Sequence, residues 1–350
     1  MTAADTPLCA DSKNADARTR LLALINANWT TQALSVATQL RLAEFLGNGP
    51  LTVQDLAQST SCHTPSLWRL LRALTTLGVT SQEEDGRFAL TDLGVLLQSD
   101  VPGSLGAWAQ FCGTSSWKTW SQLADCVRSG ESVRKRARGA DGFGHLQDDR
   151  DAALLFNRAM VSLTASVAAA VVQIVDFAGA KSVVDVGGGF GELVAAVLSA
   201  HPAMHGVLFD LAHATESAVH RLAEVGVADR CEVVTGSFFD NVPSGGDVYL
   251  LKSILHDWDD EHCAVILGNC RRAMGPRARL QVIERMMPEH LAVSPHDQGI
   301  ARSDLNMLIG TGGCERTQEQ FRSMLHAAGL RAAGLVALSD GYSAYEAVPE

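Results

Sequence analysis

Apolar residues in the first part of the chain recur at helical spacing. From about residue 18 they lie three and four positions apart, as an amphipathic helix requires. Two shorter helical segments follow within residues 52–79, the second opening at Thr64-Pro65, where a cap and a first-turn proline belong, and ending at Gly78. A polar turn at Asp85-Gly86 then separates two short β-like stretches. Two helices followed by a hairpin predict a winged helix.

The pattern changes in the second half of the chain. Residues 105–179 are again helical, and from about residue 180 short apolar runs alternate with amphipathic segments. Such alternation predicts a mostly parallel sheet with helices on both faces. After a helix near 317–328, the runs 329–340 and 342–348 are separated by a short turn, which predicts an antiparallel pair at the end of the sheet.

These patterns together predict an α/β fold. We expect a Rossmann-like sheet, mostly parallel with an antiparallel final strand, preceded by an α-helical winged-helix domain. The expected segments are a flexible tail at 1–17, the winged helix at 18–104, a helical connector at 105–179 and the sheet domain at 180–350.

Composition excludes several kinds of partner. A formal net charge of −11 gives no chain-wide attraction to phosphate backbones, so we do not expect nucleic acid as a partner. Residues 159–175 form an uncharged run that approaches the length of a membrane span, but its Ser, Thr and Gln residues favour a buried helix over membrane insertion. The eight cysteines contain no C-x-x-C pair, and the N-terminus has no apolar signal sequence. Both features predict a cytoplasmic protein.

Two further segments have both a functional and a structural interpretation. Residues 65–77 carry only Arg69 and Arg72 as basic residues among many apolar ones, so this helix is better suited to bind protein than DNA. The basic cluster 134–138 is interpreted as a solvated loop and not as an anion patch.

A glycine-rich turn predicts a nucleoside ligand. A strand ending in Asp185 turns through Gly187, Gly188, Gly189 and Gly191 into a helix, which brings bare backbone close to a ligand. Dinucleotide enzymes need a glycine at the sixth position of this turn, where the chain has Glu192. Asp185 and Glu192 suit the mixed charge of a methionine group, and Asp210 ends the next strand, where a carboxylate can accept both ribose hydroxyls. The expected ligand is therefore S-adenosylmethionine.

His256 is the candidate catalytic residue. It follows a buried strand, beside Asp257 and Trp258, on the same carboxyl edge of the sheet as the glycine turn. A lone histidine is usually structural, but open α/β sheets place their active sites along this edge.

Five motifs in this order resemble one family. They are DVGGGFGEL at 185–193, LFDL at 208–211, LKSILHDWDDE at 251–261, QVIER at 281–285 and GGCERT at 312–317. The chain is similar, from about residue 20 to its C-terminus, to the small-molecule O-methyltransferases, which include plant caffeate and flavonoid enzymes and bacterial antibiotic-tailoring enzymes. Among the bacterial members, phenazine-modifying enzymes are similar in several of these stretches.

The resemblance implies a reaction and the residues that perform it. His256 would be the general base that removes a hydroxyl proton, and Glu284 and Glu315 would flank and orient it. A phenol with a pKa near 10 needs such a base at neutral pH. The methyl donor would be S-adenosylmethionine, the product S-adenosylhomocysteine, and no metal would be required. The acceptor would be a phenolic or N-hydroxy group of a small aromatic metabolite.

The resemblance also assigns binding residues and a partner. Gly187 would hold the methionine end, Asp210 the ribose and Phe238 the adenine, with Lys252 and Trp258 completing the adenosyl pocket. Ser237 stands where the family usually has an aspartate that accepts from the adenine amine. The expected substrate-facing residues are Trp117, Trp120, Phe156, Met160, Asp257, Asn306 and Met307. The winged helix would be a dimerisation domain of a homodimer.

Three alternatives remain open on the sequence alone. Relatives with the same fold methylate nitrogen, and others bind the same ligand but perform decarboxylation or hydroxylation. A complete set of His256, Glu284 and Glu315 argues against a lost base. The third alternative, a metabolite-sensing regulator, would need a basic recognition helix, which residues 65–77 do not provide.

Overall fold

The chain divides into two compact units. The computed structural model describes residues 8–139, 142, 143, 146 and 149–350, and the units are Met1–Ser115 and Ser116–Glu350. This division lies later than the expected boundary after residue 104. The reason is that α6 (Gly106–Gly113) packs on the first helix, where the Gln32 amide donates to the Gly113 carbonyl at 3.1 Å. A Cβ on Gly113 would lie 2.2 Å from the Ser35 Cβ, so glycine permits this close approach.

The first unit has the expected helix and hairpin order. Its remaining elements are α1 (Leu8–Gln39), α2 (Leu42–Leu46), α3 (Val53–Thr60), α4 (Thr64–Thr76), β1 (Thr80–Gln82), β2 (Phe88–Leu90) and α5 (Asp92–Val95). The Thr52 hydroxyl caps α3, and Gly78 follows α4 with a φ of 75°. The cap residue of α4 is His63, one position before the expected Thr64. β1 and β2 form the predicted antiparallel hairpin.

The first helix differs from its expected start. It begins at Leu8, within the segment expected as a tail at 1–17, while residues 1–7 lie outside the described part of the chain. Within this unit Leu56, Leu71 and Phe88 are fully buried in one core. Part of α1, by contrast, leaves its large apolar side chains exposed. These side chains are Leu21, Leu22, Leu24, Ile25 and Trp29.

The second unit is built on the predicted sheet. Its seven strands are β3 (Ser182–Val186), β4 (His205–Asp210), β5 (Cys231–Thr235), β6 (Val248–Lys252), β7 (Arg279–Arg285), β8 (Leu330–Ala337) and β9 (Tyr342–Pro349). They lie in the order β5-β4-β3-β6-β7-β9-β8. The first five are parallel, and β9 pairs antiparallel with both β7 and β8. The predicted fold class is confirmed.

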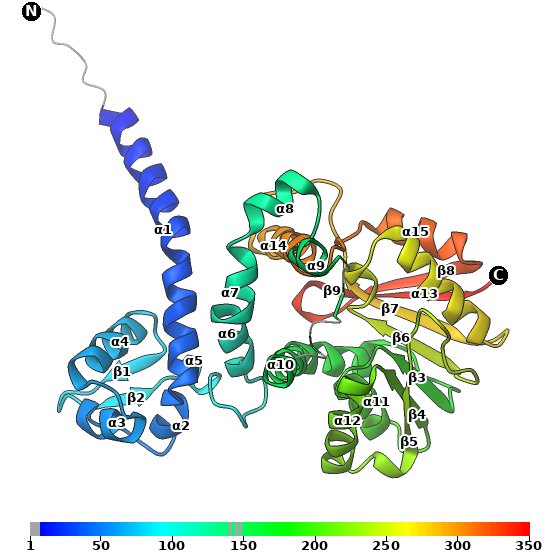
Figure 1. Ribbon diagram of the computed structural model, residues 1–350, viewed down its shortest axis with the longest axis horizontal. Helices are drawn as coiled ribbons and strands as arrows, with labels where there is room; N and C mark the ends of the chain where they lie inside the picture. Colours follow the sequence, from blue (N-terminus) through cyan, green and yellow to red (C-terminus); the bar gives the residue numbers. More distant parts are fainter. Residues whose placement is uncertain (1–7, 140–141, 144–145, 147–148) are drawn as a thin grey trace, which may run out of the picture. The chain divides into compact units, whose positions relative to one another are not determined.

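Helices cover both faces of this sheet (Figure 1). α10 (Arg150–Ile174), α11 (Glu192–Ala200) and α12 (Ala212–Val225) share one apolar core with alternate strand residues such as Val183 and Leu208. α13 (Asp260–Ala273) and α15 (Gln318–Ala327) share a second core with the intervening residues, such as Val184 and Phe209. Because successive strand residues point to opposite faces, the nearly continuous apolar runs are buried on both sides.

Several short helices connect these layers. They are α7 (Ser115–Trp120), α8 (Leu123–Ser129), α9 (Val133–Arg138), η2 (Ala228–Arg230), η3 (Leu255–Asp257) and η4 (Ser339–Gly341). A longer helix, α14 (Pro295–Gly310), was not predicted from the sequence. It has a clear start, with the Ser294 hydroxyl as cap and Pro295 in the first turn, but only Ile300, Met307 and Ile309 are buried along it. So few buried positions give a weak helical periodicity.

The apolar run at 159–175 belongs to α10. Among the described residues α10 is the helix that is long and apolar enough to cross a membrane, and 33% of its apolar window is buried. The prediction of a helix is confirmed, but most of its window is not buried as expected. Val167, Ala168 and Val171 lie in the core with α11, which fixes one face of the helix against the sheet domain.

Candidate active site

The glycine-rich turn keeps side chains away from the carboxyl end of β3. Gly187 has a φ of 72°, a left-handed conformation that favours glycine. A Cβ there would also lie 2.4 Å from the Ile254 Cδ1 and 3.5 Å from the Phe238 Cε1. A Cβ on Gly188 would lie 2.4 Å from the Leu208 Cδ1. The turn is therefore bare backbone packed between β4 and the segment after β6.

Asp210 at the end of β4 is joined to this turn. Its carboxylate accepts from the Gly189 N–H at 2.7 Å and from the Leu211 N–H at 2.6 Å. Burial raises the pKa of the Asp210 carboxyl, while these two hydrogen bonds oppose the increase. The structure thus brings Gly187 and Asp210 to one edge of the sheet, as expected.

Asp185 and Glu192 both bind protein groups. The Asp185 carboxylate is buried beneath the turn and accepts from the Val194 N–H at 3.2 Å, so it binds the first turn of α11. Burial raises its pKa to about 7. The Glu192 carboxylate pairs with Arg221 of α12 at 3.0 Å. Both acids bind protein groups in this structure, and their interpretation as partners of a methionine group stays a prediction.

An aromatic cluster lies beside the turn. The Phe238 ring meets the Trp258 ring edge to face with centroids 6.1 Å apart, and Phe239 packs against both. The Ser237 hydroxyl accepts from the Phe239 N–H at 3.2 Å, so it stabilises its own turn. Lys252, at the end of β6, donates to the Thr164 hydroxyl of α10 at 3.0 Å. These predicted ligand residues therefore surround the same end of the sheet.

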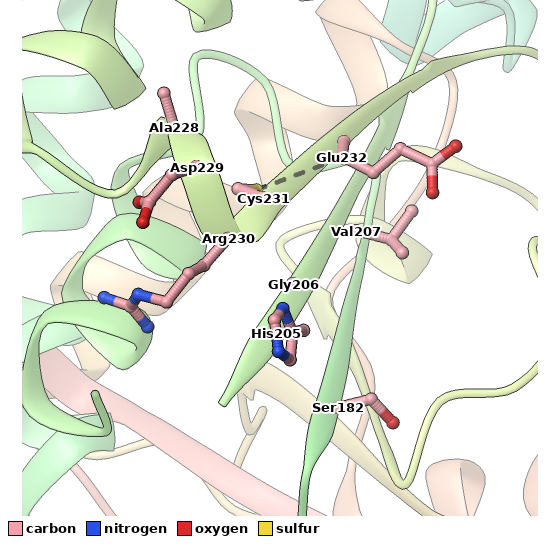
Figure 2. A pocket seen from close by; sticks show the side chains of 9 residues that line it. All are labelled: Ser182, His205, Gly206, Val207, Ala228, Asp229, Arg230, Cys231 and Glu232. Carbon is pink, nitrogen blue, oxygen red and sulfur yellow. Dashed lines mark hydrogen bonds between the residues drawn. The ribbon is translucent and has the colours of Figure 1, made fainter. Parts of the chain in front are cut away.

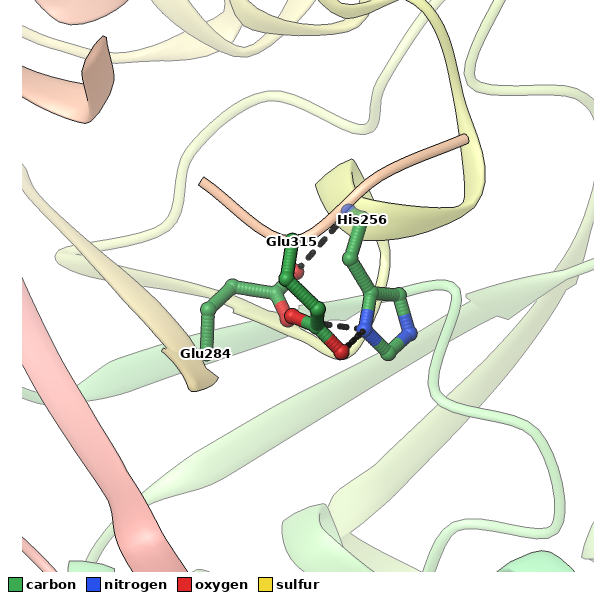
Figure 3. A group of neighbouring side chains, drawn as sticks. All are labelled: His256, Glu284 and Glu315. Atoms are coloured by element: carbon green, nitrogen blue, oxygen red, sulfur yellow. Dashed lines mark hydrogen bonds and ion pairs between the residues drawn. The ribbon is translucent and has the colours of Figure 1, made fainter. Parts of the chain in front are cut away.

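The imidazole of His256 has two glutamates on one side (Figure 3). Its Nδ1 is 3.2 Å from Oε1 of Glu315 and 3.5 Å from Oε2 of Glu284. The three residues come from different segments: His256 from η3 after β6, Glu284 from the end of β7, and Glu315 from the loop after α14. Because both carboxylates face Nδ1, the Nε2 atom is directed to the other side, where the nearest carboxylate oxygen, Oδ1 of Asp257, lies at 3.8 Å.

Each glutamate has further partners. Oε1 of Glu284 accepts from the N–H groups of Ile254 and Leu255 at 2.9 Å and of His256 at 3.4 Å. Oε1 of Glu315 accepts from the Ser303 hydroxyl of α14 at 2.5 Å. The two carboxylates thus fix the backbone before the histidine as well as the imidazole ring.

The three groups shift each other's proton affinity. Burial by itself would lower the pKa of His256, but the negative charges of Glu284, Glu315 and Asp257 hold it well above its ordinary value. Burial raises the pKa of Glu284 to about 7, although the charge of His256 opposes this increase. Burial would also raise the pKa of Glu315, but His256 reverses the effect and leaves it lowered. The buried carboxylates therefore favour the charged form of the imidazole.

The predicted substrate-facing residues fall into three groups. Trp120 of α7 and Asn306 of α14 are joined by a hydrogen bond of 3.1 Å from the indole N–H to the amide oxygen. Asp257 is buried beside His256, and Met307 is buried one position after Asn306. The other three, Trp117, Phe156 and Met160, lie on α7 and α10 and are partly exposed.

The interpretation of the basic cluster at 134–138 as a solvated loop was partly wrong. It forms α9 and not a loop, and the Arg134 guanidinium donates to the Gly142 carbonyl at 2.9 Å and lies 5.2 Å from the centre of the Phe143 ring. Phe143 in turn contacts Phe156 and Trp258. The positive charge of Arg134 also lowers the pKa of Asp257, whereas burial, the largest effect on that carboxyl, raises it. The signal that could have shown this was Phe143, an aromatic residue within an otherwise polar segment.

Other residues of the site carried no signal in the sequence. Ser303 binds Glu315 but lies on α14, a helix that was not predicted. Thr164 binds Lys252 and lies within the predicted helix at 159–175, but nothing in the sequence indicated this contact. A separate hollow lies at the opposite, amino edge of the sheet (Figure 2). Its lining includes His205 at the start of β4 and Cys231 at the start of β5. It shares no residue with the cluster around His256.

Comparison with known proteins identifies the family. Residues 120–331 match the family model of an O-methyltransferase domain, and residues 22–100 match that of an O-methyltransferase dimerisation domain. The chain belongs to the O-methyltransferase family. Its enzymatic class is S-adenosylmethionine-dependent O-methyltransferase.

Individual relatives cover nearly the whole chain. The phenazine O-methyltransferase PhzM of Lysobacter antibioticus is 38% identical over 330 residues, 94% of this chain and 95% of that protein. The crystal structure of LaPhzM superposes with a TM-score of 0.90 at 38% identity and covers 95% of this chain and 99% of that one. The aclacinomycin 10-hydroxylase RdmB of Streptomyces purpurascens is 35% identical over 306 residues, 86% of this chain and 81% of that protein.

His256, Glu284 and Glu315 could in principle hold a metal ion. Their ligand atoms lie within 4.8 Å of one another. However, Oε1 of Glu284 is already occupied by three backbone N–H groups, and Oε1 of Glu315 accepts from Ser303 and His256. The other oxygen of each glutamate, Oε2, is buried and has no hydrogen-bond partner among the described residues. The contacts therefore fit both a hydrogen-bonded triad and a metal centre that uses the Oε2 atoms.

A chelator distinguishes the two interpretations. We expect prolonged dialysis against EDTA to leave methyl transfer unchanged, because the triad needs no ion to hold the imidazole. Turnover is measured with methyl-labelled S-adenosylmethionine before and after dialysis. A loss of turnover that returns on addition of Mg²⁺ or Zn²⁺ would contradict the interpretation, and a parallel sample dialysed without EDTA controls for inactivation during handling.

Proposed function

We propose that this enzyme methylates a hydroxyl group of a small aromatic secondary metabolite, with His256 as general base. The observation that supports this proposal is the orientation of the imidazole. Its Nδ1 faces Glu315 at 3.2 Å and Glu284 at 3.5 Å, which leaves Nε2 to receive the proton of a substrate. Glu284 and Glu315 orient the ring and stabilise its charged form.

In this proposal, the residues of the chain carry out the proton transfer. Nε2 of His256 takes the hydroxyl proton as an oxygen lone pair forms the new bond to carbon and the sulfur–carbon bond breaks in line. S-adenosylmethionine supplies the electrophilic methyl group and leaves as the neutral thioether S-adenosylhomocysteine. One proton thus moves to the enzyme, and no oxidant or metal is needed. Because two carboxylates are already beside the ring, the developing imidazolium charge forms in a negative environment.

The residues at the edge of the sheet are suited to a methionine-linked nucleoside. We assign the bare turn at Gly187 to the methionine part, Asp210 to the ribose hydroxyls, and Phe238 to the adenine ring. Support comes from the position of Phe238, whose Cε1 lies 3.5 Å from where a Gly187 Cβ would be. Lys252 and Trp258 border the same region, and Ser237 would offer a hydroxyl in place of the family's aspartate.

The proposed substrate class is based on the residues assigned to the substrate and on the relatives. Trp117, Trp120, Phe156, Met160, Asn306 and Met307 provide aromatic and apolar surface with few polar groups, which suits a flat aromatic ring. Asp257 is the acidic group nearest to Nε2 and can accept from a second polar group of the substrate. A phenolic or N-hydroxy acceptor on a small ring system meets both requirements.

The two same-fold alternatives make different demands on the site. Nitrogen methylation needs a weaker base, because a neutral amine is a good nucleophile before it loses a proton. Hydroxylation or decarboxylation needs no base at this position. A strong base, such as a histidine held by two buried glutamates, is needed most where a hydroxyl with a pKa near 10 must lose its proton. We therefore favour hydroxyl methylation.

Removing the imidazole tests the base directly. We expect His256→Ala to lower kcat by about two to four orders of magnitude, the usual contribution of a positioned general base. S-adenosylmethionine affinity, measured by calorimetry, is expected to change little because His256 lies outside the assigned nucleoside residues. A panel of phenolic, N-hydroxy and amine-bearing aromatics serves as acceptors. Undiminished turnover with a hydroxyl acceptor would remove His256 from the mechanism.

The pH profile tests the role of the glutamates. The base must be neutral to accept a proton, and its pKa is raised, so kcat/KM is expected to rise with pH through that raised pKa. Glu315→Gln removes one negative charge beside the ring, which lowers the pKa of His256. The acid limb of the profile is then expected to move to lower pH. The control is Glu319→Gln, an exposed glutamate of α15 paired with Arg322; an equal shift in both variants, or a shift to higher pH, would refute the assignment.

We also propose that the enzyme is a homodimer formed through the first unit. The support is the match of residues 22–100 to a dimerisation domain, together with the exposed apolar side chains of α1. A row of such large residues on one helix is costly in water and marks an interaction surface.

Charge placed in this row should separate the subunits. Leu24 is 70% exposed within its unit, so Leu24→Glu is expected to fold normally and to shift the mass measured by light scattering from dimer to monomer. Val293→Glu is the matched control, because Val293 is 87% exposed on a loop of the second unit. A monomeric mass for the unaltered protein at micromolar concentration would rule out the dimer.

A further inference from the structure

Arg316 is a fully buried guanidinium whose function is not explained by the triad. It directly follows Glu315, and its residue is 1% exposed. Its counter-ion, Asp260 at the start of α13, is 82% exposed and accepts from Nε at 3.0 Å and from Nη2 at 2.8 Å. A charge removed from water in this way is costly unless its hydrogen bonds are satisfied.

The other bonds of Arg316 go to the backbone around His256. Nη1 donates to the Leu255 carbonyl at 2.8 Å and to the Cys314 carbonyl at 3.4 Å, and Nη2 donates to the Trp258 carbonyl at 2.7 Å. Leu255 directly precedes His256, and Trp258 lies two positions after it. Together with the two bonds to Asp260, these contacts use five donors, which is the full capacity of a guanidinium.

Glu284 binds the backbone N–H groups of the same turn. That carboxylate accepts from the N–H groups of Ile254, Leu255 and His256, while Arg316 binds carbonyls on either side of the histidine. A backbone pairing between Met286 and Arg316 ties the Glu315 segment to the end of β7, with the Met287 N–H donating to the Arg316 carbonyl at 2.9 Å. The end of β7, which carries Glu284, and the segment that carries Glu315 are therefore joined to each other beside the turn of His256.

We propose that Arg316 is a positioning residue for the methyl-transfer reaction. It fixes the backbone turn of His256, so that the ring fixed by Glu284 and Glu315 directs Nε2 at the acceptor hydroxyl. The neighbouring residues Glu315 and Arg316 have complementary roles, since the carboxylate holds the ring and the guanidinium holds the main chain. This inference rests on the proposed role of His256 as base.

The chemistry of the side chain explains why arginine occupies this position. The two carbonyls and the Asp260 carboxylate lie in different directions, and the planar guanidinium reaches all of them with separate N–H groups. A lysine ammonium concentrates its donors at one point and cannot span these acceptors. The segment that carries Arg316 also packs closely on this turn, since a Cβ on Gly313 would lie 2.1 Å from the His256 carbonyl oxygen.

A double-mutant cycle separates positioning from simple structural support. We expect Arg316→Gln to lower kcat about 10- to 100-fold, the effect of misplacing a catalytic group by about 1 Å, with S-adenosylmethionine affinity unchanged by calorimetry. In the His256→Ala background, the same change is expected to lower the residual turnover by less than about twofold, because residues that act through one group are not additive. Arg316→Lys should recover little of the loss.

Controls make each outcome decisive. Arg271→Gln removes a guanidinium that donates to the Gly329 carbonyl at 3.0 Å, at the other end of α13, and should leave kcat unchanged. If Arg316→Gln does not fold, Asp260→Asn replaces it in the cycle, since that exposed side chain anchors the same guanidinium. Equal losses in both backgrounds, or an unchanged kcat, would overturn the proposal. If His256→Ala alone retains full turnover, the proposed base fails, and any loss in Arg316→Gln then has another cause.

Discussion

The active site depends on one buried carboxylate, that of Glu284. Taking an ionised carboxylate out of water costs several kcal/mol, and the cost is offset only by close partners. Here the partners are three consecutive backbone N–H groups and the imidazole of His256. Since one side chain binds both the main chain and the ring of the histidine, the position of the base follows from the end of β7. The rest of the site is built around that contact.

The sheet topology brings the remaining groups to this point. Parallel strands end at a common edge, so the turn after β3, Asp210 after β4, His256 after β6 and Glu284 at the end of β7 meet there without any contact being specified locally. Glu315 reaches the same place differently, on a loop after α14. The backbone pairing of Met286 with Arg316 aligns that loop with β7. β9 pairs antiparallel with β7 on the other edge, so the strand that carries Glu284 lies inside the sheet, where this side chain is fully buried.

The sequence predicted those parts that depend on local patterns. Strand and helix alternation indicated the order of the sheet domain, and the five motifs pointed to His256, Glu284 and Glu315, which the structure brings together. Contacts between distant segments were not predictable in the same way. Asp185 was expected to face a ligand although it binds the α11 backbone, and the packing of α6 on α1 moved the domain boundary. Arg316 carried no signal of burial, because a charged residue before a helix normally faces solvent.

The two negative charges beside His256 affect which acceptor hydroxyls this base can deprotonate. Two buried carboxylates raise the pKa of His256, which makes its neutral form a stronger base but a rarer one at neutral pH. A stronger base reduces the pKa gap to a phenol, whose ordinary pKa is near 10, so proton transfer becomes easier once the neutral form is present. An acceptor that ionises more readily, such as an N-hydroxy group or a phenol on an electron-poor ring, would need less of that strength. In the proposed reaction the triad therefore suits hydroxyls that are hard to ionise.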